Sequence, residues 1–281
     1  MSYLTIDPKE IPTPKLQGYL QGAIAPRPIA FASTINRNGQ VNLSPFSFFN
    51  MFSTKPPILV FSPSRRVRDN TTKHTLENVR EVPEVVVNIV NYAMVEQSSL
   101  ASCEYPKGVN EFVKAGFTEL PSTRVRPPRV AESPASFECR VNEVISLGSE
   151  GGAGNLIICE ILLAHFKTEI LDEHGQVDPQ QLDAVARMGG DFYCRAHGEN
   201  IFTVPKPNTK LGIGFDELPE EIRNSKVLSG NDLGRLANIE KLPEVVNAKN
   251  SGRDVTSQHL LAKKLLAEGK VEEAWQVLLE G

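Results

Sequence analysis

The chain has 281 residues, of which 40% are hydrophobic and 23% are charged, the composition of an ordinary soluble globular protein. This length fits one large domain, or one domain with an appendage. The formal net charge of −4 argues against nucleic-acid binding, because no overall excess of basic residues is present to neutralise phosphates. Local patches could still bind small anions.

The four cysteines, Cys103, Cys139, Cys159 and Cys194, form no CxxC pair, so zinc and thioredoxin-like sites are not indicated. We interpret the last three, which have apolar or strand-like neighbours, as small buried residues in a reducing compartment. The first residues lack the pattern of a signal peptide. No segment reaches the roughly 18 apolar residues that a membrane span needs. We therefore expect a cytoplasmic protein with no membrane partner.

Strand patterns dominate the chain after an irregular, proline-rich arm at 1–27 that contains a short amphipathic turn near 16–21. Strands are predicted at 29–35, 41–44, 46–52, 58–62, 84–90, 137–147 and 155–166, with a short one ending at Tyr193. Asn38-Gly39 indicates a hairpin turn. Pro45 cannot donate a ladder hydrogen bond, so we expect a break or bulge there. The apolar segment 155–166 is typical of a strand buried on both faces.

Helices are predicted at 69–80, 93–101 and 110–115, the first of them capped by Asn70, Thr71 or Thr72. The sequence GSEGGAG before residue 155 indicates a flexible glycine loop, and Gly189-Gly190 a tight backbone approach. No GxGxxG follows a strand, so a Rossmann unit is not indicated. This density of strands favours an antiparallel barrel over a doubly wound sheet.

The tail differs from the rest of the chain. PKPNT, from residue 205, indicates a linker, and helices are predicted at 218–225, 232–239 and 257–280, the last a helix-turn-helix pair with Gly269 at its corner. We therefore expect two domains, a barrel at 1–205 and a helical extension at 206–281.

Cations and hydroxyls are concentrated between residues 62 and 75. They are Ser62, Ser64, Arg65, Arg66, Arg68, Asn70, Thr71, Thr72, Lys73 and Thr75. A phosphate group needs charged donors and is stabilised by the free amides of a helix N-terminus, and this segment offers both. The alternative is a solvated basic loop whose hydroxyls only cap the helix.

The segment NLSPFSFFN, residues 42–50, has the groups that a flat ring would need. Ser44, Ser47 and the interrupted backbone at Pro45 and Phe46 could donate hydrogen bonds, and neighbouring aromatic side chains could cover the ring. The alternative is that these aromatic residues belong to the core.

Several segments in order resemble the flavin reductase-like, FMN-binding split-barrel family. They are APRPIAFASTINRNGQVNLSPFSFFNMFSTKPPILVFSPS, EVVVNIV, NLIICEILLAHF and ARMGGDFY, within about residues 15–205. The resemblance implies a mainly β, Greek-key split β-barrel with peripheral helices, which forms a homodimer with FMN at the subunit interface. It also implies reduction of flavin by NADH or NADPH, with hydride passing to flavin N5.

The resemblance also implies roles for individual residues. The family's N-x-x-P-F-S-x-F segment falls on Asn42, Pro45, Phe46, Ser47 and Phe49, and its K-D-T on 73–75, where His74 replaces the usual aspartate. The expected cofactor-binding set is Thr34, Asn42, Ser44, Pro45, Phe46, Ser47, Ser62, Arg65, Arg68, Asn70, Lys73, His74 and Thr75. His165 is the candidate catalytic residue, with a satisfied histidine at a strand end as the alternative.

Three functions remain open at this point. The first is an NAD(P)H-dependent FMN reductase, with a flavin-dependent oxygenase as its candidate partner. The second is a non-catalytic FMN-binding electron carrier or sensor, and the third is an interaction module that binds a partner through its tail. A metal site is not expected, because the five histidines are scattered without ligand spacing. The sequence does not distinguish NADH from NADPH.

Overall fold

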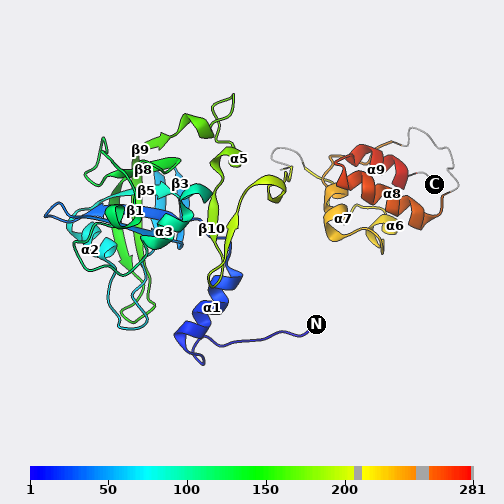
Figure 1. Cartoon of the computed structure of the whole chain (residues 1–281). Helices are drawn as coiled ribbons and strands as arrows, with labels where there is room; N and C mark the ends of the chain where they lie inside the picture. Colours follow the sequence, from blue (N-terminus) through cyan, green and yellow to red (C-terminus); the bar gives the residue numbers. More distant parts are fainter. Residues whose placement is uncertain (206–210, 245–252, 280–281) are drawn as a thin grey trace. The chain divides into compact units, whose positions relative to one another are not determined.

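A computed structural model describes residues 1–205, 211–244 and 253–279, which form two compact units at 1–202 and 203–281 (Figure 1). The predicted linker PKPNT lies, apart from Pro205, outside the described residues. None of the helices in the described part of the chain is long and apolar enough to span a membrane.

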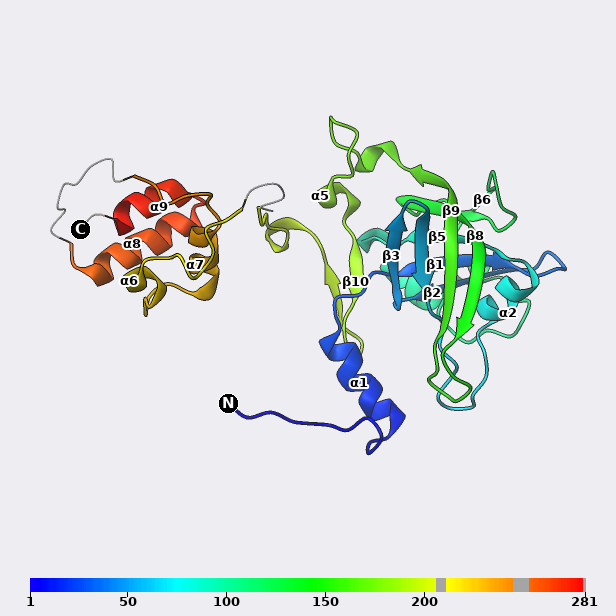
Figure 2. The ribbon, with the colours of Figure 1, turned by 180° about the vertical axis from the view of Figure 1, so that it is seen from behind.

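The first unit is built on a seven-stranded sheet in which every neighbouring pair of strands is antiparallel, in the order β2-β1-β5-β8-β9-β4-β3 (Figure 2). The strands are β1 (Ala30–Ile35), β2 (Val41–Phe46), β3 (Phe49–Thr54), β4 (Pro57–Phe61), β5 (Glu84–Ile89), β8 (Ala135–Ser146) and β9 (Asn155–Phe166). These bounds lie close to the predicted strands, and the mainly antiparallel fold with peripheral helices is confirmed.

The two edge strands of this sheet, β2 and β3, are consecutive in the chain and are joined only by Ser47 and Phe48. A flat sheet would hold its edges five strands apart, so the sheet curves until its edges meet at this link. β2 and β3 are not paired with each other, and the barrel is therefore open along one seam.

The predicted break at Pro45 is wrong, because β2 continues through Pro45, which pairs with Phe31 of β1, and ends at Phe46. An edge strand has one side with no ladder to maintain, and there the missing N–H of a proline is tolerated. The expectation for β9 is also wrong in part, since only its first half alternates between buried and half-buried residues. Its second half alternates between half-buried and exposed ones.

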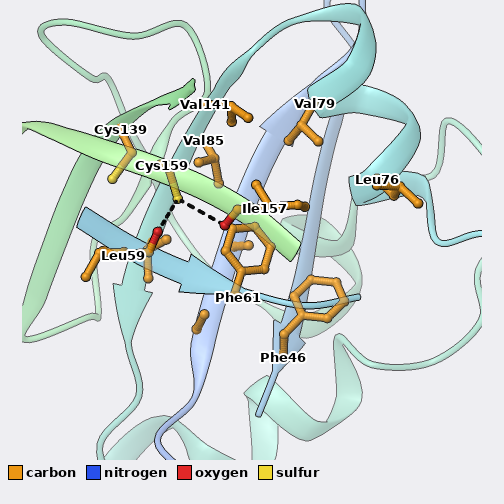
Figure 3. Packing of buried hydrophobic residues seen from close by; sticks show 13 residues of the cluster. Phe46, Leu59, Phe61, Leu76, Val79, Val85, Cys139, Val141, Ile157 and Cys159 are labelled. Atoms are coloured by element: carbon orange, nitrogen blue, oxygen red, sulfur yellow. Dashed lines mark hydrogen bonds between the residues drawn. The ribbon is translucent and has the colours of Figure 1, made fainter. Parts of the chain in front are cut away.

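The core divides at β1, as the alternation of its side chains predicts. Ala30 and Ala32 face one cluster inside the barrel, and Phe31 faces a second cluster. Figure 3 shows the barrel cluster, in which Phe46 and Phe61 have ring centroids 5.5 Å apart. Cys139 and Cys159 are fully buried in that cluster, as predicted, whereas Cys194 is only half-buried. The second cluster is completed by residues at 90–130, including the helices α3 (Val95–Leu100) and α4 (Glu111–Ala115).

The connection from β4 to β5 carries α2 (His74–Glu81), which begins later than the predicted 69–80. Asn70 has a left-handed φ of 57°, and Asp69 accepts hydrogen bonds from the amide and hydroxyl of Thr71, so the chain forms a turn there instead of a helix. Leu76 and Val79 are buried in the barrel cluster. This packing fixes the N-terminus of α2 beside the barrel.

A helix at the start of the chain, α1 (Thr13–Ala23), replaces the short turn expected there. It leans on the ribbon formed by β10 (Val185–Arg187) and β11 (Tyr193–Arg195). A Cβ at Gly189 would lie 2.8 Å from the Cα of Gly22, which confirms the tight approach predicted at this position. The smaller elements of the unit are β6 (Glu119–Leu120), β7 (Arg129–Val130), α5 (Pro179–Leu182) and the 3₁₀ turns η1 (Tyr92–Met94), η2 (Thr168–Ile170) and η3 (Gly198–Asn200).

The second unit is helical, with α6 (Glu220–Arg223), α7 (Gly230–Ala237), α8 (Val255–Ala267) and α9 (Val271–Leu278). Ser229 and Asp232 form a capping box at the start of α7. Gly269, with a φ of 78°, forms the predicted corner between α8 and α9. Trp275 is buried in a separate core, where its indole N–H donates to the Leu236 carbonyl at 3.2 Å.

Candidate functional site

The loop at 62–73, between β4 and α2, lies against the loop at 147–154, between β8 and β9 (Figures 1 and 2). The Arg65 amide donates to the Ala153 carbonyl at 2.8 Å, and the Gly152 amide donates to the Arg65 carbonyl at 3.0 Å. A Cβ at Gly154 would lie 2.7 Å from Ser62 Oγ. The glycine loop, which was expected to be only flexible, therefore supports the cationic loop by close backbone contact.

A small polar cavity of about 20 Å³ lies at the N-terminus of α2. It gathers residues from β2, from the 62–73 loop and from the segment after α3, and is lined by Asn42, Ser44, Arg66, Lys73, His74, Thr75, Ala101, Ser102, Cys103, Glu104, Tyr105 and Glu111. The N-cap residue Lys73 makes no side-chain capping bond. The amides of His74 and Thr75 have no intrahelical acceptor, because they begin the helix. Free amides and cations therefore converge on this cavity, which we call the α2 cavity.

The positive groups at the α2 cavity are partly desolvated. Burial lowers the pKa of Lys73, and the charge of Arg66 lowers it further. Burial also lowers the pKa of His74, which favours its neutral imidazole. An anion bound here would offset the repulsion between these cations and the helix N-terminus.

Three of the expected cofactor-binding residues are buried and bonded within the protein. Asn42 donates to the Thr75 hydroxyl at 2.9 Å, and Asn78 donates to the Thr34 hydroxyl at 3.1 Å. Thr34 has no exposed surface and does not line the α2 cavity. These hydrogen bonds join α2 to β1 and β2. Thr34 therefore stabilises the position of α2 without lining the cavity.

The arginines of the 62–73 loop bind different partners. Arg65 turns back onto Asn70, donating to its side-chain and backbone oxygens at 2.6 Å each. Arg68 is largely exposed and pairs with Asp69 and Glu104. Arg66, which the residue assignments omitted, lines the α2 cavity and donates to the Thr72 carbonyl at 2.6 Å. Sequence spacing cannot tell which of two adjacent arginines faces inward, because the loop has no regular period.

A second, larger cavity of about 340 Å³ lies between α1 and the seam of the barrel. Leu16 and Leu20 of α1 and Ile24, which follows the helix, line it together with Phe48 and Ser64. Arg27 is buried at its edge, where its guanidinium donates to the carbonyls of residues 21, 24 and 188 at 2.6–2.9 Å. We call it the seam cavity, and it is mostly apolar.

The remaining residues that were expected to border the ring are Pro45, Phe46 and Ser47, which lie in the chain between Ser44 of the α2 cavity and Phe48 of the seam cavity. Ser47 is half-buried and its hydroxyl lies 3.5 Å from Arg27 Nε, while the Ser62 amide donates to the Phe48 carbonyl at 2.8 Å. Pro45 is half-buried on β2. Phe46 is a core residue, which favours the alternative interpretation for that side chain.

His165 is not brought together with the 62–73 loop. The Asn155 side chain donates to the Pro63 carbonyl at 3.1 Å, so the start of β9 lies beside that loop. His165 is ten residues further on, which along an extended strand is roughly 30 Å. Its Nε2 lies 2.7 Å from the carboxylate of buried Glu138. The structure thus places His165 as a bonded residue near a strand end.

No group of three or more His, Cys, Asp or Glu side chains within the described residues is arranged to hold a metal ion. The chemistry available at the two cavities is that of anion binding beside an apolar slot. An open antiparallel barrel with these features is suited to a small molecule that carries both an anionic group and an apolar ring.

Comparison with known proteins identifies the family. The model of the flavin reductase like domain matches residues 23–180, more than half of the chain, and the chain belongs to this family. An uncharacterised protein of Aquifex aeolicus is 38% identical over 191 residues, covering 68% of this chain and 95% of that protein.

Two solved structures are similar to the first unit. Nitrilotriacetate monooxygenase component B from Bacillus cereus is 27% identical with a TM-score of 0.67, over 72% of this chain and all of that chain. A putative flavin reductase with a split barrel domain from Shewanella frigidimarina is 25% identical with a TM-score of 0.59, over 70% of this chain and 95% of that chain. The fold is therefore the split barrel, as the sequence predicted.

Proposed function

We propose that the protein is an NAD(P)H-dependent FMN reductase. The observation that carries this proposal is the α2 cavity, where partly buried Lys73 and two free helix amides converge at the seam-side strand β2 in a flavin reductase-like barrel. A phosphate monoester is the ligand group that best satisfies such a set of donors.

The two cavities flank one short segment of chain. Ser44 lines the α2 cavity and Phe48 lines the seam cavity, and the residues between them form the end of β2 and the bend that follows it. In this arrangement Lys73 and the α2 amides hold the phosphate, while the backbone at 45–47 and the side chain of Phe48 border the ring. Bound flavin would supply the capacity to accept hydride from a nicotinamide.

A homodimer is part of the proposal. Large apolar side chains are exposed on both sides of the seam. Leu20 of α1, Ile24 just after it, and Met51 and Phe52 of β3 have 48–68% of their surface exposed, and Phe48 has 40%. None of the eleven residues of α1 is buried. Apolar surface of this kind is typical of a protein–protein contact, and a second copy would cover the seam where we place the flavin.

A physiological role for the reduced flavin is also part of the proposal. One similar structure is a monooxygenase component, and we propose that this protein delivers reduced flavin to a flavin-dependent oxygenase. Its four free thiols suit the reducing cytoplasm in which we place it. The helical unit at 203–281 is proposed as an extension that serves partner binding.

Nicotinamide oxidation tests the activity. Purified protein with free FMN and either NADH or NADPH is expected to lower absorbance at 340 nm at a rate that depends on both protein and flavin. Oxidation of neither nucleotide, by protein that has bound FMN, would instead support the electron carrier or sensor. The nucleotide that is oxidised faster identifies the donor.

Lys73→Ala tests the phosphate site. We expect it to weaken FMN binding by about 1–3 kcal/mol, the usual size of a lost charge-assisted hydrogen bond. Riboflavin, which lacks the phosphate, should bind equally to both proteins in a fluorescence titration. Lys107→Ala is the matched control, because Lys107 is exposed, pairs with Glu77 and does not line the cavity. Equal FMN affinity in the wild type and Lys73→Ala refutes the assignment.

A further inference from the structure

Glu104 binds two arginines at the proposed phosphate site, Arg66, which lines the α2 cavity, and the exposed Arg68 next to it. Its carboxylate accepts from Arg66 Nε at 2.9 Å and from the Arg68 guanidinium at 2.8 Å. Glu104 lies in the segment between α3 and α4, more than thirty residues from either arginine, and it lines the α2 cavity itself.

The carboxylate and a phosphate compete for the same donors. The α2 cavity has a volume of only about 20 Å³, close to the space of a single water molecule. A phosphate group cannot enter beside Glu104 in this arrangement and also bind Arg66. Either the carboxylate leaves the arginines, or the two anions repel each other at short range.

The contacts that hold Glu104 are easily broken. The Arg68 side chain is 71% exposed and that of Glu104 is 44% exposed, so solvent weakens this ion pair, while the Arg66 side chain in the other pair is 16% exposed. A segment held by exposed ion pairs opens at low cost.

We propose that Glu104 is an internal competitor for the flavin phosphate, which keeps FMN exchangeable and makes it a diffusible substrate instead of a permanently held group. This inference rests on the proposed function. FMN can bind the two arginines only after Glu104 has released them. The free energy of breaking these ion pairs is subtracted from the affinity for FMN. The effect is specific to phosphorylated flavins, since riboflavin carries no group that needs these donors.

Glu104→Gln removes the competing charge and keeps the side chain's size. We expect FMN to bind about two- to tenfold more tightly, because binding no longer has to break two ion pairs at the surface side of the cavity. FMN should also dissociate more slowly in a stopped-flow chase with excess riboflavin, and riboflavin affinity should be unchanged. Because Glu104 is on the surface, the variant should keep the circular dichroism spectrum of the wild type.

Glu77→Gln is the matched control. It removes the same charge near the N-terminus of α2, but its carboxylate binds Lys107 and Thr72 and touches neither arginine. A general electrostatic effect would tighten FMN binding equally in both variants, and that result would overturn the role of Glu104. So would an unchanged FMN affinity in Glu104→Gln.

The outcomes separate the two proposals. If the wild type binds FMN and oxidises NADH or NADPH while Glu104→Gln matches it in affinity, the competitor role fails and the reductase stands. If the wild type binds neither FMN nor riboflavin, the proposed function fails, and the inference with it.

Discussion

Glu138 shows how a single buried charge organises this barrel. It has no exposed surface, and it accepts hydrogen bonds from the amides of Thr123 and Arg124 and lies 2.7 Å from His165. Burial alone would raise the pKa of Glu138, but these hydrogen bonds outweigh it and lower the pKa. The ionised carboxylate therefore anchors the proline- and arginine-rich loop at 121–129 to β8 and β9.

This anchor predicts a dependence of stability on pH. A carboxyl with a lowered pKa in the folded state stabilises the fold above its unfolded pKa of about 4.3, and that contribution is lost as pH falls through the folded value. We expect Glu138→Gln to reduce the free energy of unfolding at pH 7 by about 1–3 kcal/mol, because the amides lose a charged acceptor.

Urea denaturation at pH 7 and near pH 3 measures this effect. The difference between wild type and Glu138→Gln should shrink at the lower pH, because the stabilisation is lost progressively as pH falls below the unfolded pKa towards the lowered folded pKa. Glu143→Gln on the exposed side of the same strand is the control and should change stability by less than about 0.5 kcal/mol. A difference that stays constant with pH would mean that the charge of Glu138 does not stabilise the loop.

For single residues, the sequence predicted which of them lie close to the site. It predicted less well which hydrogen bonds each of them makes. The α2 cavity does bring together Asn42, Ser44 and the segment 73–75. Residue type does not reveal, however, that the Asn42 amide is bonded to Thr75 or that Arg65 turns onto Asn70. A polar side chain can satisfy its hydrogen bonds with a ligand or with a neighbour, and the choice depends on the tertiary fold.

For helices and strands as well, the sequence predicted local features better than tertiary contacts. Strand periodicity predicted the strands and the bounds of β9, because alternation and β-branched residues are properties of the local sequence. The start of α2 was predicted five residues too early, because Asn70, Thr71 and Thr72 are equally good in turns and caps. The pairing of the glycine loop with the 62–73 loop depends on β4 and β9 being neighbours, which no local pattern records.

The edge strand β3 is where we expect the two subunits of the proposed dimer to meet. It pairs only with β4, and Met51 and Phe52 are 60% and 68% exposed. An unpaired edge with large apolar side chains favours association unless a charge blocks it. We expect Phe52→Glu to shift the protein toward monomer in analytical ultracentrifugation and to weaken flavin binding, since we place the flavin where two copies meet.

Asn50→Glu is the control for this change. Asn50 is an exposed polar residue on the same strand, so the charge is added without removing apolar surface. It should perturb the dimer less than Phe52→Glu does. A wild type that sediments as a monomer at micromolar concentration, or a Phe52→Glu variant that remains fully dimeric, would exclude β3 from the interface.

The whole chain consists of two units with separate cores. The family model ends at residue 180, and the A. aeolicus relative covers 68% of the chain. The second unit buries Leu236, Leu266 and Trp275 in its own cluster. A separate core is what a unit needs to fold by itself, so the stability of each unit should respond to changes in its own cluster alone.

Trp275 makes this independence measurable, because it is the only tryptophan in the chain. Its fluorescence reports on the second unit, while FMN binding reports on the first. Leu236→Ala removes a fully buried side chain beside the indole and should destabilise the fluorescence transition by about 2–5 kcal/mol. FMN affinity should stay unchanged.

Val87→Ala, in the barrel core, is the reciprocal control and should leave the tryptophan transition in place. If either substitution moves both transitions together, the two units unfold as one, and the helical extension is part of the barrel's stability.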